Sequence, residues 1–217
     1  MTYKIKKMKS LRFLFMVLVG CALTATSFTS CINDDDDNTT LTKEEAARRL
    51  GIMQGSYSGK TYVFYNNEAE IKSDSVITSF TISTDSLFTV DLPVSMLSHA
   101  VKDKNETDLI EALKAEGTKK VYFKMLLNDI YGKTDPNVYA YYLYPASYLN
   151  FTCSHGEKTY EIEVKFTMSG YYFNALNVTS YGLYSKGKAT GYLPIGSITV
   201  NSSNYMITPV PFFVTGE

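Results

Sequence analysis

The sequence lacks tryptophan, has only two histidines and contains three cysteines in 217 residues. A zinc site usually takes three or four ligands, so this supply of histidine and cysteine argues against one. Beyond residue 30, no stretch reaches the roughly 20 apolar residues that a membrane-spanning helix needs. The glycine patterns of phosphate-binding loops and of serine-hydrolase elbows are also missing. We therefore expect no metal, no cofactor and no enzymatic activity.

Residues 1–30 are typical of a lipoprotein signal peptide. Five basic residues precede an uncharged apolar run over residues 13–23, and small or hydroxylated residues then lead to Cys31. Cleavage before Cys21 fits the local cleavage pattern better, but it would cut inside the apolar run. We predict that Cys31 is the lipid-bearing first residue of the mature chain, with cleavage at Cys21 or a cut without lipid as the alternatives. Stable anchoring needs more than one acyl chain.

An acidic run follows this cysteine and consists of Asp34, Asp35, Asp36 and Asp37. Adjacent like charges repel one another, so we expect residues 31–40 to form an extended tether. A short signal, a Ser-Cys pair and an acidic run together resemble the surface-export signal of Bacteroidetes lipoproteins. The resemblance implies a lipid-anchored protein of the outer membrane that faces the cell exterior.

Two further segments carry a resemblance to uncharacterised families of Bacteroidetes-type surface lipoproteins. They are residues 55–60, which read GSYSGK, and residues 82–97, which read ISTDSLFTVDLPVSML. The resemblance implies a role at the cell surface, but it indicates neither an activity nor the identity of a ligand.

The charge balance excludes one class of partner. Removing residues 1–30 removes five of the 21 basic residues and none of the 22 acidic ones, which leaves a net charge of −6. A mildly acidic domain without a basic patch is not expected to bind nucleic acid. With Cys31 acylated, only Cys153 remains as a thiol, so the folded part has no internal disulfide.

Alternating apolar residues predict a mainly β domain over residues 41–217. The clearest strand is residues 160–168, in which Tyr160, Ile162 and Val164 lie on one face and glutamates lie on the other. About nine such strands must bury their inner faces against one another. We favour an antiparallel β-sandwich, with a partly closed calycin-like barrel as the alternative. Two prolines place the last strand, residues 205–214, at a sheet edge.

Three segments are predicted to be helical. Thr42 and Glu45 form a capping box that starts a short helix ending at Gly51. Residues 93–101 form a short second candidate, and residues 105–116 a clearer one with an apolar face. This last helix is a short excursion within the β domain and could cover one open end of it.

Several residues match chemical motifs that have simpler explanations. Asp34 to Glu45 follows the spacing of a calcium loop, but Thr39 stands where the sharp turn needs glycine. Cys153 and His155 share one face of a strand, as do Glu161 and Glu163. A buried thiol beside a turn and a solvent-facing pair of carboxylates explain these residues without catalysis.

Tyrosines provide the candidate contact surface, because tyrosine offers a flat apolar ring and a hydroxyl at low entropy cost. The cluster that we single out for ligand contact is Tyr139, Tyr141, Tyr142 and Tyr144. Ser75 and Ser86 each follow an aspartate and precede an apolar residue, which resembles an acceptor motif for O-glycans. We expect a cell-surface binding protein for a glycan or a protein. A barrel that carries a small apolar ligand is the alternative, and a hydrolase is the least favoured class.

Overall fold

The computed structural model describes residues 41–67, 70–101, 103–128, 137–172, 176–205 and 212–217. The predicted signal peptide and tether lie outside these ranges, so both stay predictions. The helices are α2 (Lys43–Met53), the 3-10 helix η1 (Val94–Ala100) and α3 (Thr107–Ala115). All helices that the structure describes are too short or too polar to span a lipid bilayer.

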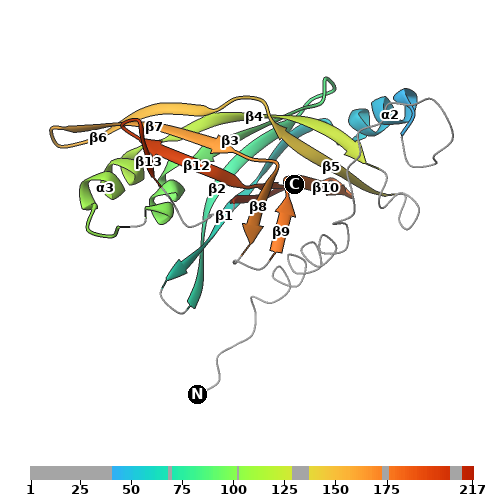
Figure 1. Cartoon of the computed structure of the whole chain (residues 1–217). Coiled ribbons are helices and arrows are strands. Elements are labelled where there is room, and N and C mark those ends of the chain that lie inside the picture. Colours follow the sequence, from blue (N-terminus) through green and yellow to red (C-terminus); the bar gives the residue numbers. More distant parts are fainter. Residues whose placement is uncertain (1–40, 68–69, 102, 129–136, 173–175, 206–211) are drawn as a thin grey trace, which may run out of the picture.

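A closed barrel of eight antiparallel strands forms the centre of the molecule, in the order β1-β14-β11-β10-β5-β4-β3-β2 (Figure 1). Its strands are β1 (Gly55–Asn67), β2 (Glu70–Ile82), β3 (Leu87–Pro93), β4 (Thr118–Asn128), β5 (Val138–Pro145), β10 (Tyr181–Ser185), β11 (Lys188–Leu193) and β14 (Phe212–Gly216). The mainly β prediction is confirmed. The strands form a barrel and not the favoured sandwich, and the barrel is closed, which is compatible with the calycin-like alternative.

Closure depends on β14, which pairs with β1 on one side and with β11 on the other. The prediction that the last strand lies at a sheet edge is wrong for residues 212–214, because β14 has a partner strand on both sides. Pro209 and Pro211 themselves lie outside the described residues.

A second sheet of four strands extends from one side of the barrel, in the order β13-β12-β7-β6 (Figure 1). Its strands are β6 (Leu149–His155), β7 (Lys158–Phe166), β12 (Ile195–Val200) and β13 (Ser203–Tyr205). The predicted alternation in residues 160–168 is confirmed by β7, which buries Ile162, Val164 and Phe166. A short hairpin, β8 (Ser169–Tyr172) and β9 (Leu176–Thr179), leads back to the barrel.

Aromatic rings contact one another inside the barrel. Phe80 and Phe88 stack with their ring centroids 5.0 Å apart, and Phe88 also contacts Phe123 and Tyr141. An eight-stranded barrel is just wide enough for side chains to fill it. Strand β10 approaches one of these rings closely at Gly182, where an added Cβ would lie 2.2 Å from a ring atom of Tyr141.

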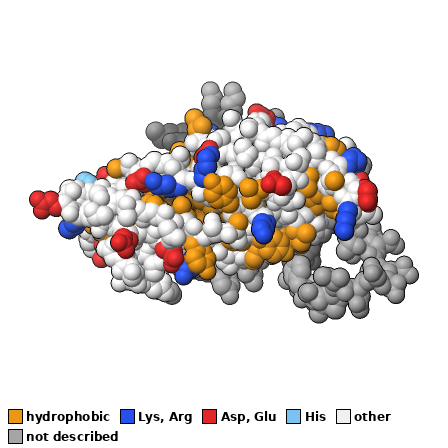
Figure 2. All heavy atoms as spheres, turned by 90° about the horizontal axis from the view of Figure 1, so that it is seen from above, with side chains coloured by type: hydrophobic (Ala, Val, Ile, Leu, Met, Phe, Trp, Pro, Cys, Tyr) orange, Lys and Arg blue, Asp and Glu red, His pale blue; other side chains and the backbone are white. Residues whose placement is uncertain are grey.

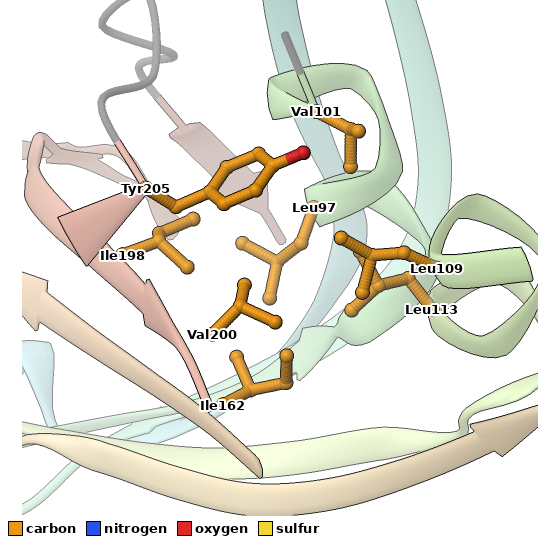
Figure 3. Close-up of a pocket in the computed structure, with 8 residues that line it drawn as sticks. All are labelled: Leu97, Val101, Leu109, Leu113, Ile162, Ile198, Val200 and Tyr205. Carbon is orange, nitrogen blue, oxygen red and sulfur yellow. The ribbon is translucent and has the colours of Figure 1, made fainter. Parts of the chain in front are cut away.

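Helices α3 and η1 cover the inner face of the second sheet. Their aliphatic side chains face aliphatic side chains of β7 and β12 and the Tyr205 ring of β13 across a small apolar cavity (Figure 3). The cavity is lined by Leu97, Val101, Leu109, Leu113, Ile162, Ile198, Val200 and Tyr205. Its free volume is about 10 Å³, room for roughly one water molecule. These side chains belong to the same hydrophobic core as the barrel interior, so the second sheet and its helices extend that core.

Helix α2 lies at the other end of the molecule from α3 (Figure 1). The predicted cap is confirmed, since the Thr42 hydroxyl accepts a hydrogen bond from the Glu45 N–H at 3.2 Å. The helix continues past Gly51, where we expected it to end, and stops at Met53. Met53 is fully buried and its carbonyl accepts a hydrogen bond from the Tyr57 hydroxyl, so tertiary packing extends the helix over the barrel end.

Candidate functional site

The four tyrosines singled out for ligand contact all lie on β5, and the strand separates them into two pairs. Successive side chains of a strand point to opposite faces. Tyr139 and Tyr141 point into the barrel and are buried, whereas Tyr142 and Tyr144 point outward. Only the second pair is placed to meet a partner at the surface.

Tyr141 belongs to the core. It is 1% exposed, and its hydroxyl donates a hydrogen bond to the Thr190 carbonyl at 2.7 Å. Burial raises the pKa of this phenol far above its usual range, so it stays protonated. Tyr139 stacks on Tyr184 near α2, with the Arg49 guanidinium 5.2 Å from its ring centre. Both rings stabilise the fold and are unavailable to a ligand outside the barrel.

The outward pair joins further aromatic and aliphatic side chains on one surface, which we name the outer aromatic face. Its members are Tyr122, Leu126, Tyr142, Tyr144 and Tyr148. Strands β4 and β5 bring them together, since Leu126 pairs with Tyr142 in the ladder. Hydrophobic side chains gather along the side where β4 and β5 run, with lysine or arginine side chains among them (Figure 2).

The outer aromatic face is the main apolar exposure of the described chain. Six large hydrophobic side chains are exposed in the described ranges, and four of them belong to this face, with 39–56% of their surface in contact with solvent. The other two, Ile52 and Ile77, lie on α2 and β2. Gathered exposure of this kind marks interaction surfaces, whereas scattered apolar residues need no explanation.

Lysines interleave with these rings. Lys124 lies between Tyr122 and Leu126 on β4 and pairs with Tyr144 across the ladder. At the rim, the Lys165 ammonium lies 4.9 Å from the centre of the Tyr148 ring, a favourable cation–π contact. The face therefore carries the Lys124 ammonium among its apolar side chains, with Lys165 at its rim.

Tyr122 and Leu126 were not among the residues singled out from the sequence. The signal was present, because β4 alternates buried Val121, Phe123 and Met125 with outward residues. On a strand with one wet face, the outward positions are normally polar. Tyrosine and leucine at the outward positions 122 and 126 therefore indicate a contact surface.

The other candidate residues lie elsewhere. Cys153 is buried on β6, and burial raises the pKa of its thiol, which disfavours the nucleophilic thiolate. Glu163 forms an ion pair with Lys165 at 3.1 Å and accepts a hydrogen bond from Thr199. Nowhere in the described ranges do three or more metal-binding side chains come together. The structure brings together no acid–base pair or nucleophile from these candidates.

The two serines of the acceptor-like motifs lie at different places. Ser75 is half-buried on β2, where its N–H bonds the Asp74 carboxylate. Ser86 is half-buried in the turn between β2 and β3 and has a φ of 62°. Cys31 and Asp34 to Asp37 lie outside the described residues.

The fold and this surface define a small antiparallel β-barrel domain with an added sheet and an open aromatic face. The chain belongs to the family described as a domain of unknown function, DUF4840, whose model matches residues 52–200. No curated protein matches the chain. The matched range begins within α2 and ends with β12, so it leaves out β14, the strand that closes the barrel.

Proposed function

We propose that this chain is a lipid-anchored binding protein of the bacterial cell surface, and that its outer aromatic face contacts a glycan or protein partner. The observation that carries the proposal is the gathering of four exposed large hydrophobic side chains on one face of β4 and β5 and the loop after them. A soluble domain gains nothing from this exposure unless a partner covers it.

The anchoring half of the proposal rests on the sequence. A basic start, an apolar run and a small-residue cut before Cys31 support lipidation, and four aspartates support a tether that holds the domain away from the membrane. The similarity to Bacteroidetes-type surface lipoproteins supports display on the outer face of the outer membrane.

The alternatives find less support. A carrier of a small apolar ligand requires a hollow barrel, whereas the rings of Phe80, Phe88, Phe123 and Tyr141 contact one another inside this one. The cavity beside α3 has room for about one water molecule. A hydrolase requires converging catalytic groups, and Cys153, His155, Glu161 and Glu163 do not form such a site in the described structure.

Matched variants test the contact surface. Tyr144→Ser and Tyr148→Ser each remove an exposed ring from the face, whereas Ile77→Ser removes a side chain that is 79% exposed on β2. We expect the tyrosine variants to lose binding on an array of surface glycans and in capture of proteins from intact cells, and the Ile77 variant to bind normally. Equal binding by all of them would refute the proposed surface.

Anchoring is tested separately by mass spectrometry of the mature N-terminus and by protease treatment of intact cells. We expect an acylated Cys31 and digestion of the domain without breaching the outer membrane. An unmodified thiol at Cys31, or full protection of the domain until the membrane is opened, would contradict display at the surface.

A further inference from the structure

One lysine of the outer aromatic face stands out because its charge is not balanced. Lys124 is exposed at the centre of the face, and within the described structure no carboxylate pairs with it. Its neighbours are Tyr122 and Leu126 along β4, with Tyr144 and Leu87 on the adjacent strands. An ammonium group surrounded by apolar side chains favours an anion that arrives with a partner.

The remaining charges at the border of the face are paired. Lys120 lies 2.8 Å from Asp91, which also accepts a hydrogen bond from Ser79 at 2.6 Å. Lys165 lies 3.1 Å from Glu163. Within each pair the lysine and carboxylate charges balance, so among the described residues Lys124 is the charge of the face that lacks a charged partner.

The shape of the surface narrows the choice of partner. The exposed side chains lie along two neighbouring strands and the loop after β5, which makes an open strip instead of a closed pocket. A strip suits an extended chain that meets several rings in succession. Tyrosine offers such a chain both an apolar ring face and a hydroxyl group.

Two other occupants fit less well. A second copy of this chain would place the same patch against itself. The carboxylates at the border of that patch, Asp91 and Glu163, already pair with lysines, so they would not balance the charge of Lys124. A bilayer surface favours side chains that protrude and insert, whereas Tyr122 and Tyr144 are more than half covered by the sheet.

We infer that the outer aromatic face binds an acidic polysaccharide, with its sugar rings on Tyr122, Tyr144 and Tyr148 and a carboxylate or sulfate on the Lys124 ammonium. This inference rests on the proposed function and narrows the partner to one chemical class. Binding of this kind weakens as salt rises, since the central contact is electrostatic and exposed.

Polygalacturonate and its methyl ester are suitable probes, because they share one sugar backbone and differ in charge. The full chain, extracted in a mild detergent, is run by affinity electrophoresis in gels that contain either polymer. We expect polygalacturonate to retard the protein and the ester to do so far less. Lys124→Gln should weaken retention about tenfold, as for loss of one charge-assisted contact.

Lys60→Gln is the matched control, since Lys60 is exposed on β1, away from the face. It should bind as the unmodified chain does. If both lysine variants lost retention equally, or if the methyl ester retarded the unmodified chain as strongly as polygalacturonate does, the contact between Lys124 and an acidic group would be overturned. A glycan-binding surface would still be possible. Capture by anionic phosphatidylglycerol vesicles without any retention by polysaccharide would overturn the inference in favour of a lipid surface. If the unmodified chain bound neither glycans nor proteins, the proposed function would be overturned together with this inference.

Discussion

Close approach between backbone and aromatic rings decides which residues the barrel accepts. The Tyr141 ring lies against β10 at Gly182, and its hydroxyl reaches the Thr190 carbonyl on β11. Further along the same wall of the barrel, Gly59 of β1 lies against the backbone of Thr215 on β14. At both places the absence of a side chain lets neighbouring strands and rings approach closely, so these glycines specify the barrel through packing.

Gly182→Ala should therefore destabilise the protein. The added Cβ would lie 2.2 Å from both the Thr190 carbonyl oxygen and the Tyr141 ring. A backbone oxygen cannot move aside without a large cost in free energy. We expect a loss of about 3 kcal/mol in the free energy of unfolding, the upper part of the range for overpacking. Chemical denaturation measures it. Gly51→Ala is the control, because nothing lies within 4 Å of its Cβ position and alanine favours a helix. A Gly182 variant as stable as the control would contradict this packing.

Glu45 makes stability depend on pH at the first turn of α2. Hydrogen bonds from Arg48 and Arg49 lower the pKa of its carboxyl from 4.5 to about 2. A depressed pKa in the folded state means that the stabilisation is present above pH 4.5 and is lost as the pH falls towards 2. We expect Glu45→Gln to be less stable than the unmodified chain at pH 6 and to approach it below pH 3. Thermal unfolding at several pH values measures this, and a gap that widens on acidification would refute it.

At the scale of the element, the sequence predicts the features that depend on hydrophobic periodicity and on helix caps. The alternation of β7 and the Thr42 cap of α2 both follow from neighbours within a few residues. β5 behaves differently, because aromatic or aliphatic residues occupy both of its faces. No period then distinguishes the buried Tyr141 from the outward Tyr142, and only the pairing with β4 and β10 decides it. This is why half of the contact tyrosines predicted from the sequence proved to be core.

Helix α3 attaches the second sheet to the rest of the molecule, so its apolar face should matter to stability. Leu109 is buried among side chains of η1 and of the second sheet at the small cavity (Figure 3). Leu109→Ala would enlarge a space that already exists, and we expect a loss of about 2–5 kcal/mol. Denaturant unfolding measures the loss. Glu111→Ala, at an exposed position of the same helix, should change stability by less than about 0.5 kcal/mol.

At the scale of the whole molecule, closure of the barrel is a long-range property. Gly59 pairs with Gly216, near opposite ends of the described chain. Periodicity reports which face of a strand is buried and not which strand lies beside it, so sandwich and barrel share one sequence pattern. The outer aromatic face, in contrast, lies on the neighbouring strands β4 and β5 and the loop after them, so the closing pairs do not assemble it.

The family match and the fold therefore differ in extent, and the difference has a measurable consequence. A fragment of residues 52–200 covers the matched range but lacks β14 and most of α2. Without β14, strands β1 and β11 become open edges, which expose unpaired backbone groups and favour aggregation. The buried side chains Phe212 and Val214 would also leave the interior. We expect this fragment to lack cooperative thermal unfolding and to associate in sedimentation experiments, whereas residues 41–217 unfold cooperatively as a unit. A fragment 52–200 that is monomeric and unfolds at the same temperature as 41–217 would show that the barrel does not need its last strand.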